Sequence, residues 1–88
     1  MTDPLIAELR GRIAAADRAI LAAVNQRLEL VEQLKRHKES VDIDFVDPER
    51  ERRLIEELRA ENRGPLSDEG LEQLFREILA LVKRELAR

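Results

Sequence analysis

Apolar residues in the first forty positions recur at intervals of three, four and seven, and this pattern predicts one long amphipathic helix. Asp3 and Pro4 provide a capping residue followed by a proline at the first helical position. No proline interrupts the stretch from Leu5 to about Ser40. A helix of about 35 residues is roughly 50 Å long at 1.5 Å per residue, which is too long for a compact chain of this size to cover. The helix is therefore expected to pack against a second chain. Its apolar positions are Ile6, Leu9, Ile13, Ile20, Val24, Leu28, Val31 and Leu34.

Two shorter helices are predicted after the first one. Residues 39–46 (ESVDIDFV) lose the helical period and predict a loop. Asp47-Pro48 repeats the cap-and-proline pattern, and residues 62–65 (NRGP) end the second helix. Ser67 precedes two acidic residues and caps a third helix. Three helices without a strand predict an all-α fold, with residues 1–88 forming a single domain. The third helix carries an apolar stripe made of Leu71, Leu74, Phe75, Ile78, Leu79, Val82 and Leu86.

The composition strengthens the expectation of a helical oligomer. Charged residues are 40% of the chain and hydrophobic residues 43%, with two Phe and no Trp or Tyr. A mixture rich in Ala, Leu, Glu and Arg favours helices and lacks the β-branched and aromatic runs of strands. A helical chain of 88 residues gains most by sharing its core with a partner. We therefore expect an oligomer.

The charge pattern and the residue counts exclude several classes of function. The net charge is −3, and the 16 basic and 19 acidic residues are interspersed, which argues against nucleic-acid binding. Cysteine is absent and there is one His, so a thiol nucleophile is excluded and a metal site is not expected. No apolar run approaches the ~20 residues of a membrane span, and no signal-peptide pattern opens the chain. A cytoplasmic protein without membrane contact is the simplest expectation.

Three cationic residues of the first helix have an informative spacing. Arg27 and Lys38 are eleven residues apart, which places them on one face about 16 Å apart along the axis. Arg10 lies about 25 Å before Arg27 and about 42 Å from Lys38, so one straight helix cannot bring Arg10 and Lys38 to the same small ligand. If both serve one site, Arg10 must come from a second chain whose long helix runs antiparallel. The alternative is that these residues coat a solvated helix face.

The chain resembles the all-helical class of chorismate mutases from about Leu5 to Leu86. The segments that carry the resemblance are LRGRIAAADRAILAAVNQRLELVEQLKRHK, DFVDPERERRLIEEL and LFREILALVKREL. They contain an Arg, a second Arg, a Lys and an Asp-x-x-Arg-Glu element in the order and at the separations of that family. The resemblance implies that two three-helix chains interlock as an intertwined homodimer and that each of two identical sites uses residues of both long helices.

The resemblance also implies roles for residues of the first helix. Arg10 corresponds to the arginine that the opposite protomer lends to a substrate carboxylate. Arg27 corresponds to the arginine that binds the other carboxylate, a task suited to the planar guanidinium. Lys38 corresponds to the lysine that reaches the ether oxygen of the breaking bond.

The Asp-x-x-Arg-Glu element contributes three further site residues by resemblance. Asp47 is expected to present its backbone N–H near the ring hydroxyl of the substrate. Glu51 is expected to accept a hydrogen bond from that hydroxyl, and Arg50 matches a neighbouring arginine of the family.

The third helix departs from the family pattern. The family has a small hydroxyl residue and, four positions later, a Gln or Glu that touches the ether oxygen. The matching positions here are Val82 and Leu86, which are both apolar. Glu85 lies within the apolar stripe, where a desolvated carboxyl group could stay protonated and act as a donor. We predict that Glu85 substitutes for the missing donor; the alternative is a rim residue that pairs with a nearby Arg.

The function implied by the resemblance is the rearrangement of chorismate to prephenate in aromatic amino acid biosynthesis. This isomerase reaction needs no nucleophile, proton transfer or cofactor. Two alternatives stay open: a helical dimerisation or regulatory module of weak activity that needs a pathway partner enzyme, and an isochorismate pyruvate lyase. Val82 and Leu86 support the module, whereas the set of Arg10, Arg27, Lys38 and Glu51 counts against it. The residues of the first helix do not separate the lyase from the mutase.

Overall fold

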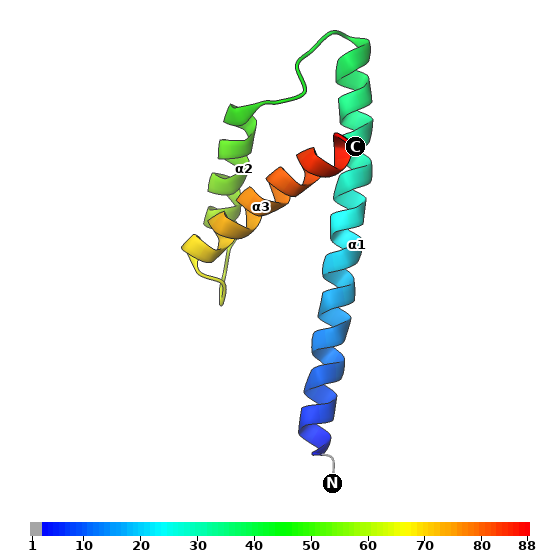
Figure 1. Cartoon of the computed structure of the whole chain (residues 1–88). Coiled ribbons are helices and arrows are strands. Elements are labelled where there is room, and N and C mark those ends of the chain that lie inside the picture. The colour runs from blue at the N-terminus through cyan, green and yellow to red at the C-terminus, as the bar shows by residue number, and fades with distance from the viewer. Residues whose placement is uncertain (1–2) are drawn as a thin grey trace.

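The computed structural model describes residues 3–88 as three helices, with no strand in that range. α1 runs from Pro4 to Ser40, α2 from Pro48 to Glu61 and α3 from Asp68 to Leu86. α3 packs against both other helices, and its C-terminus meets the C-terminal half of α1 (Figure 1). The N-terminal half of α1 projects away from α2 and α3, so the molecule measures 62 × 27 × 17 Å. The predicted all-α fold is confirmed.

Each helix begins at the capping residue that the sequence predicts. The Asp3 carboxylate accepts hydrogen bonds from the backbone N–H groups of Leu5 and Ile6 at 2.8 and 3.2 Å. The side chains of Asp47 and Ser67 accept the backbone N–H three residues later at 3.1 and 3.0 Å. These bonds satisfy N–H groups that the first helical turn leaves without a partner.

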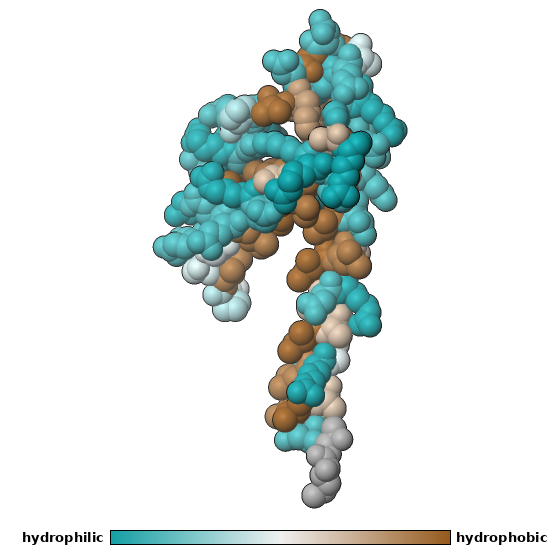
Figure 2. All heavy atoms as spheres, in the orientation of Figure 1, coloured by the Kyte–Doolittle hydropathy of each residue, from teal (hydrophilic) through white to brown (hydrophobic). Residues whose placement is uncertain are grey.

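The buried core of the single chain is small. Among the described residues, the buried side chains are Ile55 of α2 and Leu71 and Val82 of α3. α1 has no fully buried residue, although Ile13 and Ile20 are large apolar side chains. Both are more than 60% exposed. Figure 2 shows hydrophobic side chains along the projecting half of α1, on the side toward which α2 and α3 lie. A single chain therefore leaves in water the apolar stripe that the sequence expects a partner to cover.

Lys35 joins α1 to the C-terminus of α3 and to the loop before α2. Its Nζ donates a hydrogen bond to the backbone carbonyl of Leu86 at 3.1 Å and lies 5.7 Å from the centroid of the Phe45 ring. A cation at the end of α3 also interacts favourably with the partial negative charge of the helix C-terminus. This contact fixes where the three helices meet.

Replacing Lys35 with methionine is expected to lower the free energy of unfolding by about 1–2 kcal/mol, because the variant loses a charged hydrogen bond and a cation–π contact. Urea unfolding followed by circular dichroism at one fixed protein concentration measures the change. The control is Arg36→Met, which removes an exposed pair with Glu32 on the same helix and is expected to cost about 0.5 kcal/mol or less. Equal losses in the two variants would contradict the role given to Lys35.

Candidate active site

A cavity of about 390 Å³ opens where α1, α2, α3 and the loop before α2 meet. This volume falls within the range of small-molecule binding sites. Aliphatic and aromatic side chains from all three helices form much of its wall. They include Val31, Leu34, Leu54, Phe75, Leu79 and Val82.

The same cavity collects charged side chains from every helix. Among the described residues, its cations outnumber its carboxylates by four to two, which leaves an excess of two positive charges. Such an excess suits a small molecule that carries two negative charges. The charged residues are Arg27 and Lys38 from α1, Asp47 before α2, Arg50 and Glu51 from α2, and Lys83 from α3.

Two contacts orient the lysines of the cavity. The Lys83 ammonium lies 2.7 Å from Oε1 of Glu51, so it links α3 to α2. The Lys38 ammonium donates a hydrogen bond to the backbone carbonyl of Phe45 at 3.3 Å, so it links α1 to the loop. The two ammonium groups therefore lie on different walls of the cavity. Lys38 is on the wall formed by α1 and the loop, and Lys83 is on the wall formed by α2 and α3.

A second groove lies on α2 and α3 and shares Glu51 and Lys83 with the cavity. The three cations that this groove does not share with the cavity all form ion pairs, and Arg59 of α2 pairs with Asp68 of α3 at 3.8 Å. Arg52 pairs with Glu56 at 2.5 Å and Arg76 with Glu72 at 2.7 Å. Among the described residues, cations exceed carboxylates by two in the cavity of α1, α2 and α3 and by one in this groove, so the cavity is the candidate site.

Two carboxyl groups on exposed helix surfaces have lowered pKa values. A hydrogen bond from Arg52 lowers the pKa of the Glu49 carboxyl group. A hydrogen bond from Arg76 lowers the pKa of Glu72 in the same way. Neither carboxyl group lines the candidate cavity, so these shifts do not point to proton-transfer chemistry there.

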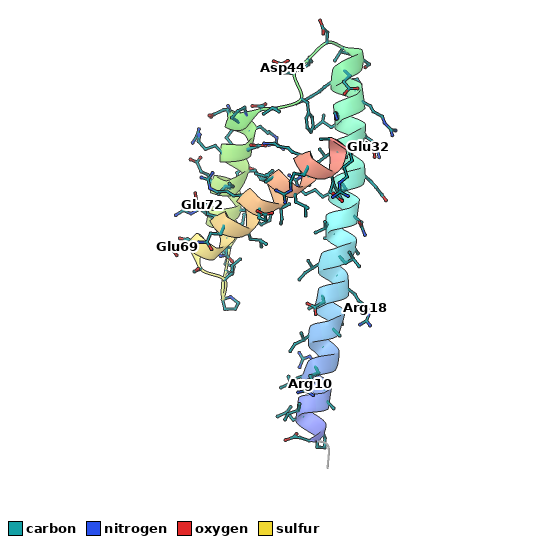
Figure 3. The ribbon with its side chains drawn as sticks, in the orientation of Figure 1. Arg10, Arg18, Glu32, Asp44, Glu69 and Glu72 are labelled. Carbon is teal, nitrogen blue, oxygen red and sulfur yellow. The ribbon has the colours of Figure 1, made fainter. Side chains whose placement is uncertain are left out.

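The structure brings most of the predicted site residues to this cavity, but not Arg10. Arg27, Lys38 and Val82 line its wall, as do the residues of the Asp-x-x-Arg-Glu element. Arg10 is exposed on the projecting half of α1, far from α2 and α3 (Figure 3). Within one protomer Arg10 cannot reach the ligand that Lys38 would bind.

Glu85 and Leu86 lie outside the cavity, beside a separate surface depression. The Glu85 carboxylate pairs with Arg88 at 3.1 Å, and about a third of the Glu85 side chain is exposed. The prediction of a desolvated carboxyl donor at Glu85 is therefore wrong for the single chain, because this carboxylate is partly exposed, paired with Arg88 and placed beside α1 outside the cavity. Leu86 instead contributes its backbone carbonyl to Lys35.

Lys83 is the cavity residue that the sequence interpretation missed. It lies four residues after Leu79 and eight after Phe75, which are both on the cavity wall, so helical spacing alone could have drawn attention to it.

The described residues contain no group of three or more acidic or His side chains that could hold a metal ion. In the described part of the chain, no helix combines the length and hydrophobicity that a membrane span requires.

The fold and the site together define a class: an all-helical domain with a cavity that carries an excess of positive charge. The family model described as chorismate mutase type II matches residues 9–85. The chain belongs to this family, and the resemblance drawn from the sequence is confirmed.

Solved structures and a curated relative agree with this assignment. Form I of the chorismate mutase of Thermus thermophilus is 34% identical, with a TM-score of 0.85 over 88% of this chain and 96% of that chain. Form II of the same enzyme is 32% identical, with a TM-score of 0.88 over 94% of both chains. A bifunctional chorismate mutase/prephenate dehydratase of Stutzerimonas stutzeri is 32% identical over 77 residues. The match covers 82% of this chain and 21% of that relative, so the chain spans about a fifth of its length.

Proposed function

We propose that two copies of this chain form a chorismate mutase that converts chorismate into prephenate. The observation that carries the proposal is the cavity of α1, α2 and α3, whose excess of positive charge matches a small dicarboxylate. Family membership supports the same activity.

The chemistry of the reaction explains why such a cavity suffices. One C–O bond of the enol ether breaks while one C–C bond forms, within a single molecule and without proton transfer. The protein has to hold the flexible side chain of the substrate over the ring in a reactive conformation. It also has to place donors where negative charge grows on the ether oxygen.

Two cations of α1 are proposed to meet these two requirements. Arg27 binds one carboxylate through two parallel N–H···O bonds, a geometry that lysine cannot reproduce. Lys38 donates to the ether oxygen. In the free protein the Lys38 ammonium is held by the Phe45 carbonyl, so it is already directed by the loop before substrate arrives.

Residues at the start of α2 are proposed to bind the ring. Glu51 accepts a hydrogen bond from the ring hydroxyl, Asp47 offers its backbone N–H nearby, and Arg50 adds positive charge at the same end. The proline-containing cap at Asp47 fixes this helix start, since the Asp47 side chain accepts the Arg50 N–H. The site therefore uses a rigid helix terminus and not a mobile loop tip.

The apolar wall has a role in the same mechanism. Val82 is 2% exposed, and Leu79 and Val31 also line the cavity. A wall of this kind keeps water from the donors, and charge–charge interactions are stronger in a water-poor site.

The proposed dimer completes each site. The exposed apolar residues on the projecting half of α1 need a cover, and an antiparallel α1 of a second copy would supply one. The same arrangement would carry Arg10 of each chain to the cavity of the other, where it would bind the second carboxylate. Formation of the dimer would then both cover the apolar stripe and complete the site.

The experiment that tests the proposal is an assay of the purified protein with chorismate and, separately, with isochorismate. Formation of prephenate from chorismate supports the mutase. Pyruvate from isochorismate would favour the lyase, and no product from either would favour a dimerisation or regulatory module. Sedimentation is expected to give twice the 10.2 kDa mass of one chain.

A pathway partner enzyme is a further proposal that rests on the apolar Val82 and Leu86. If the chain alone lacks a full set of donors, its rate with chorismate is expected to be low and to rise when a partner binds. A high rate without any other protein would remove the reason for a partner.

A further inference from the structure

One charged residue of the cavity has no role in the mechanism above. Lys83 extends from α3, and its ammonium lies 2.7 Å from the Glu51 carboxylate. The Lys83 side chain is 40% exposed and the Glu51 side chain 27%, so the pair is partly open to solvent, between the cavity and the second groove that it also lines.

The stability of the fold does not explain this placement. A pair exposed to this degree contributes about 0–1 kcal/mol to stability. The buried Ile55, Leu71 and Val82 already pack α2 and α3 together. Lys83 adds a fourth cation to a cavity that contains Arg27, Lys38 and Arg50, and in the empty site the Glu51 carboxylate balances its charge. Because Glu51 is proposed to bind the ring hydroxyl, the Lys83 ammonium becomes available to the substrate when the site is loaded.

The reaction offers this ammonium a defined partner. Guanidinium groups suit the substrate carboxylates because of their planar fork, whereas an ammonium acts as a compact point charge. The ether oxygen acquires negative charge as the C–O bond breaks, and it can accept more than one hydrogen bond. Lys38 approaches the cavity from α1 and Lys83 from α3, so the two ammonium groups come from different walls.

We propose that Lys83 is a catalytic residue that donates a hydrogen bond to the ether oxygen of the substrate. It supplies from α3 the donor that neither Val82 nor Leu86 can provide and that Glu85 is too distant from the cavity to provide. No proton leaves Lys83, since the step only stabilises charge. When substrate binds, Glu51 exchanges the ammonium of Lys83 for the ring hydroxyl. This inference rests on the proposed mutase function.

The test compares the kinetics of chorismate turnover in three proteins. Lys83→Met keeps most of the aliphatic stem and removes the donor, and we expect kcat to fall about 100-fold with KM changed by less than about threefold. Lys83→Gln keeps an N–H donor and is expected to retain kcat within about tenfold of the wild type. The split between kcat and KM and the rescue by Gln are results that a purely structural role would not produce.

The matched control is Arg84→Met, which removes the neighbouring cation on α3. Arg84 is exposed and pairs with Glu77 at 2.7 Å, outside the cavity, so its replacement is expected to leave both constants unchanged. Circular dichroism verifies that each variant is folded. If Lys83→Met does not fold, Lys83→Ala removes the same donor while favouring the helix, and the same 100-fold fall is expected.

The possible outcomes separate this inference from the proposed function. A wild-type protein that turns over chorismate, with an unchanged kcat in the folded donor-free variant, overturns the role of Lys83 alone. A rise in KM without a fall in kcat also overturns it, because Lys83 would then only attract the dianion. A wild-type protein that forms no prephenate refutes the mutase function itself.

Discussion

Replacing Arg27 with alanine is expected to lower kcat/KM for chorismate by about a thousandfold, equivalent to roughly 4 kcal/mol of transition-state stabilisation. The reason is that Arg27 holds one end of a dicarboxylate in a cavity whose wall is largely apolar, where an anion without its partner is costly. Lys38→Ala is expected to lower kcat/KM by a comparable factor, because the ether oxygen then lacks the hydrogen bond from Lys38. Steady-state assays that follow the disappearance of chorismate measure both effects.

The control for Arg27 is Arg36→Ala on the same helix. Arg36 lies outside the cavity and pairs with Glu32, so its loss is expected to leave kcat/KM near the wild-type value. The Arg27→Lys variant separates charge from geometry and is expected to recover a small part of the lost rate. Sedimentation shows whether each variant keeps the mass of the wild type. A near-normal rate in folded Arg27→Ala would contradict the assigned site.

Mixing two inactive variants, Arg10→Ala and Lys38→Ala, is expected to restore about a quarter of the wild-type activity after random reassociation. Half of the dimers then contain one chain of each kind, and one of the two sites in such a dimer has both residues intact. The effect requires Arg10 to act in the cavity of the other chain. Joint unfolding and refolding achieves the exchange, and native mass spectrometry of chains with different tags counts the mixed dimers.

A second mixture controls this experiment. Arg27 and Lys38 line the same cavity in one chain, so a mixed dimer of Arg27→Ala and Lys38→Ala has no intact site. This mixture is expected to stay inactive. If the Arg10 and Lys38 variants form mixed dimers that are equally inactive, the shared site is excluded.

The helices could be predicted because their ends depend on local interactions. The carboxylates of Asp3 and Asp47 and the hydroxyl of Ser67 each accept a backbone N–H within three residues, so capping residues in the sequence mark the helix starts directly. The common face of Arg27 and Lys38 follows in the same way from the helical repeat.

The residues of α3 could not be predicted in this way, because their environment depends on how α3 is rotated against α2. Glu85 and Lys83 both lie near the edge of the apolar stripe, two residues apart. Packing at Leu71 and Val82 turns Lys83 toward Glu51 and leaves Glu85 to Arg88. A rotation of this kind is decided by contacts between helices that are distant in sequence, and neither periodicity nor capping reports it.

The projecting half of α1 has a consequence for how mutations act on this protein. An isolated helical segment of this length is only marginally stable in water, and three buried side chains elsewhere do little to support it. Conformational order in residues 4–20 therefore depends on what covers them, and it should weaken on dilution if a second copy is the cover. Destabilising substitutions at Ile13 or Ile20 would then have small effects at high protein concentration and larger effects at low concentration. Their phenotypes would therefore vary with gene dosage.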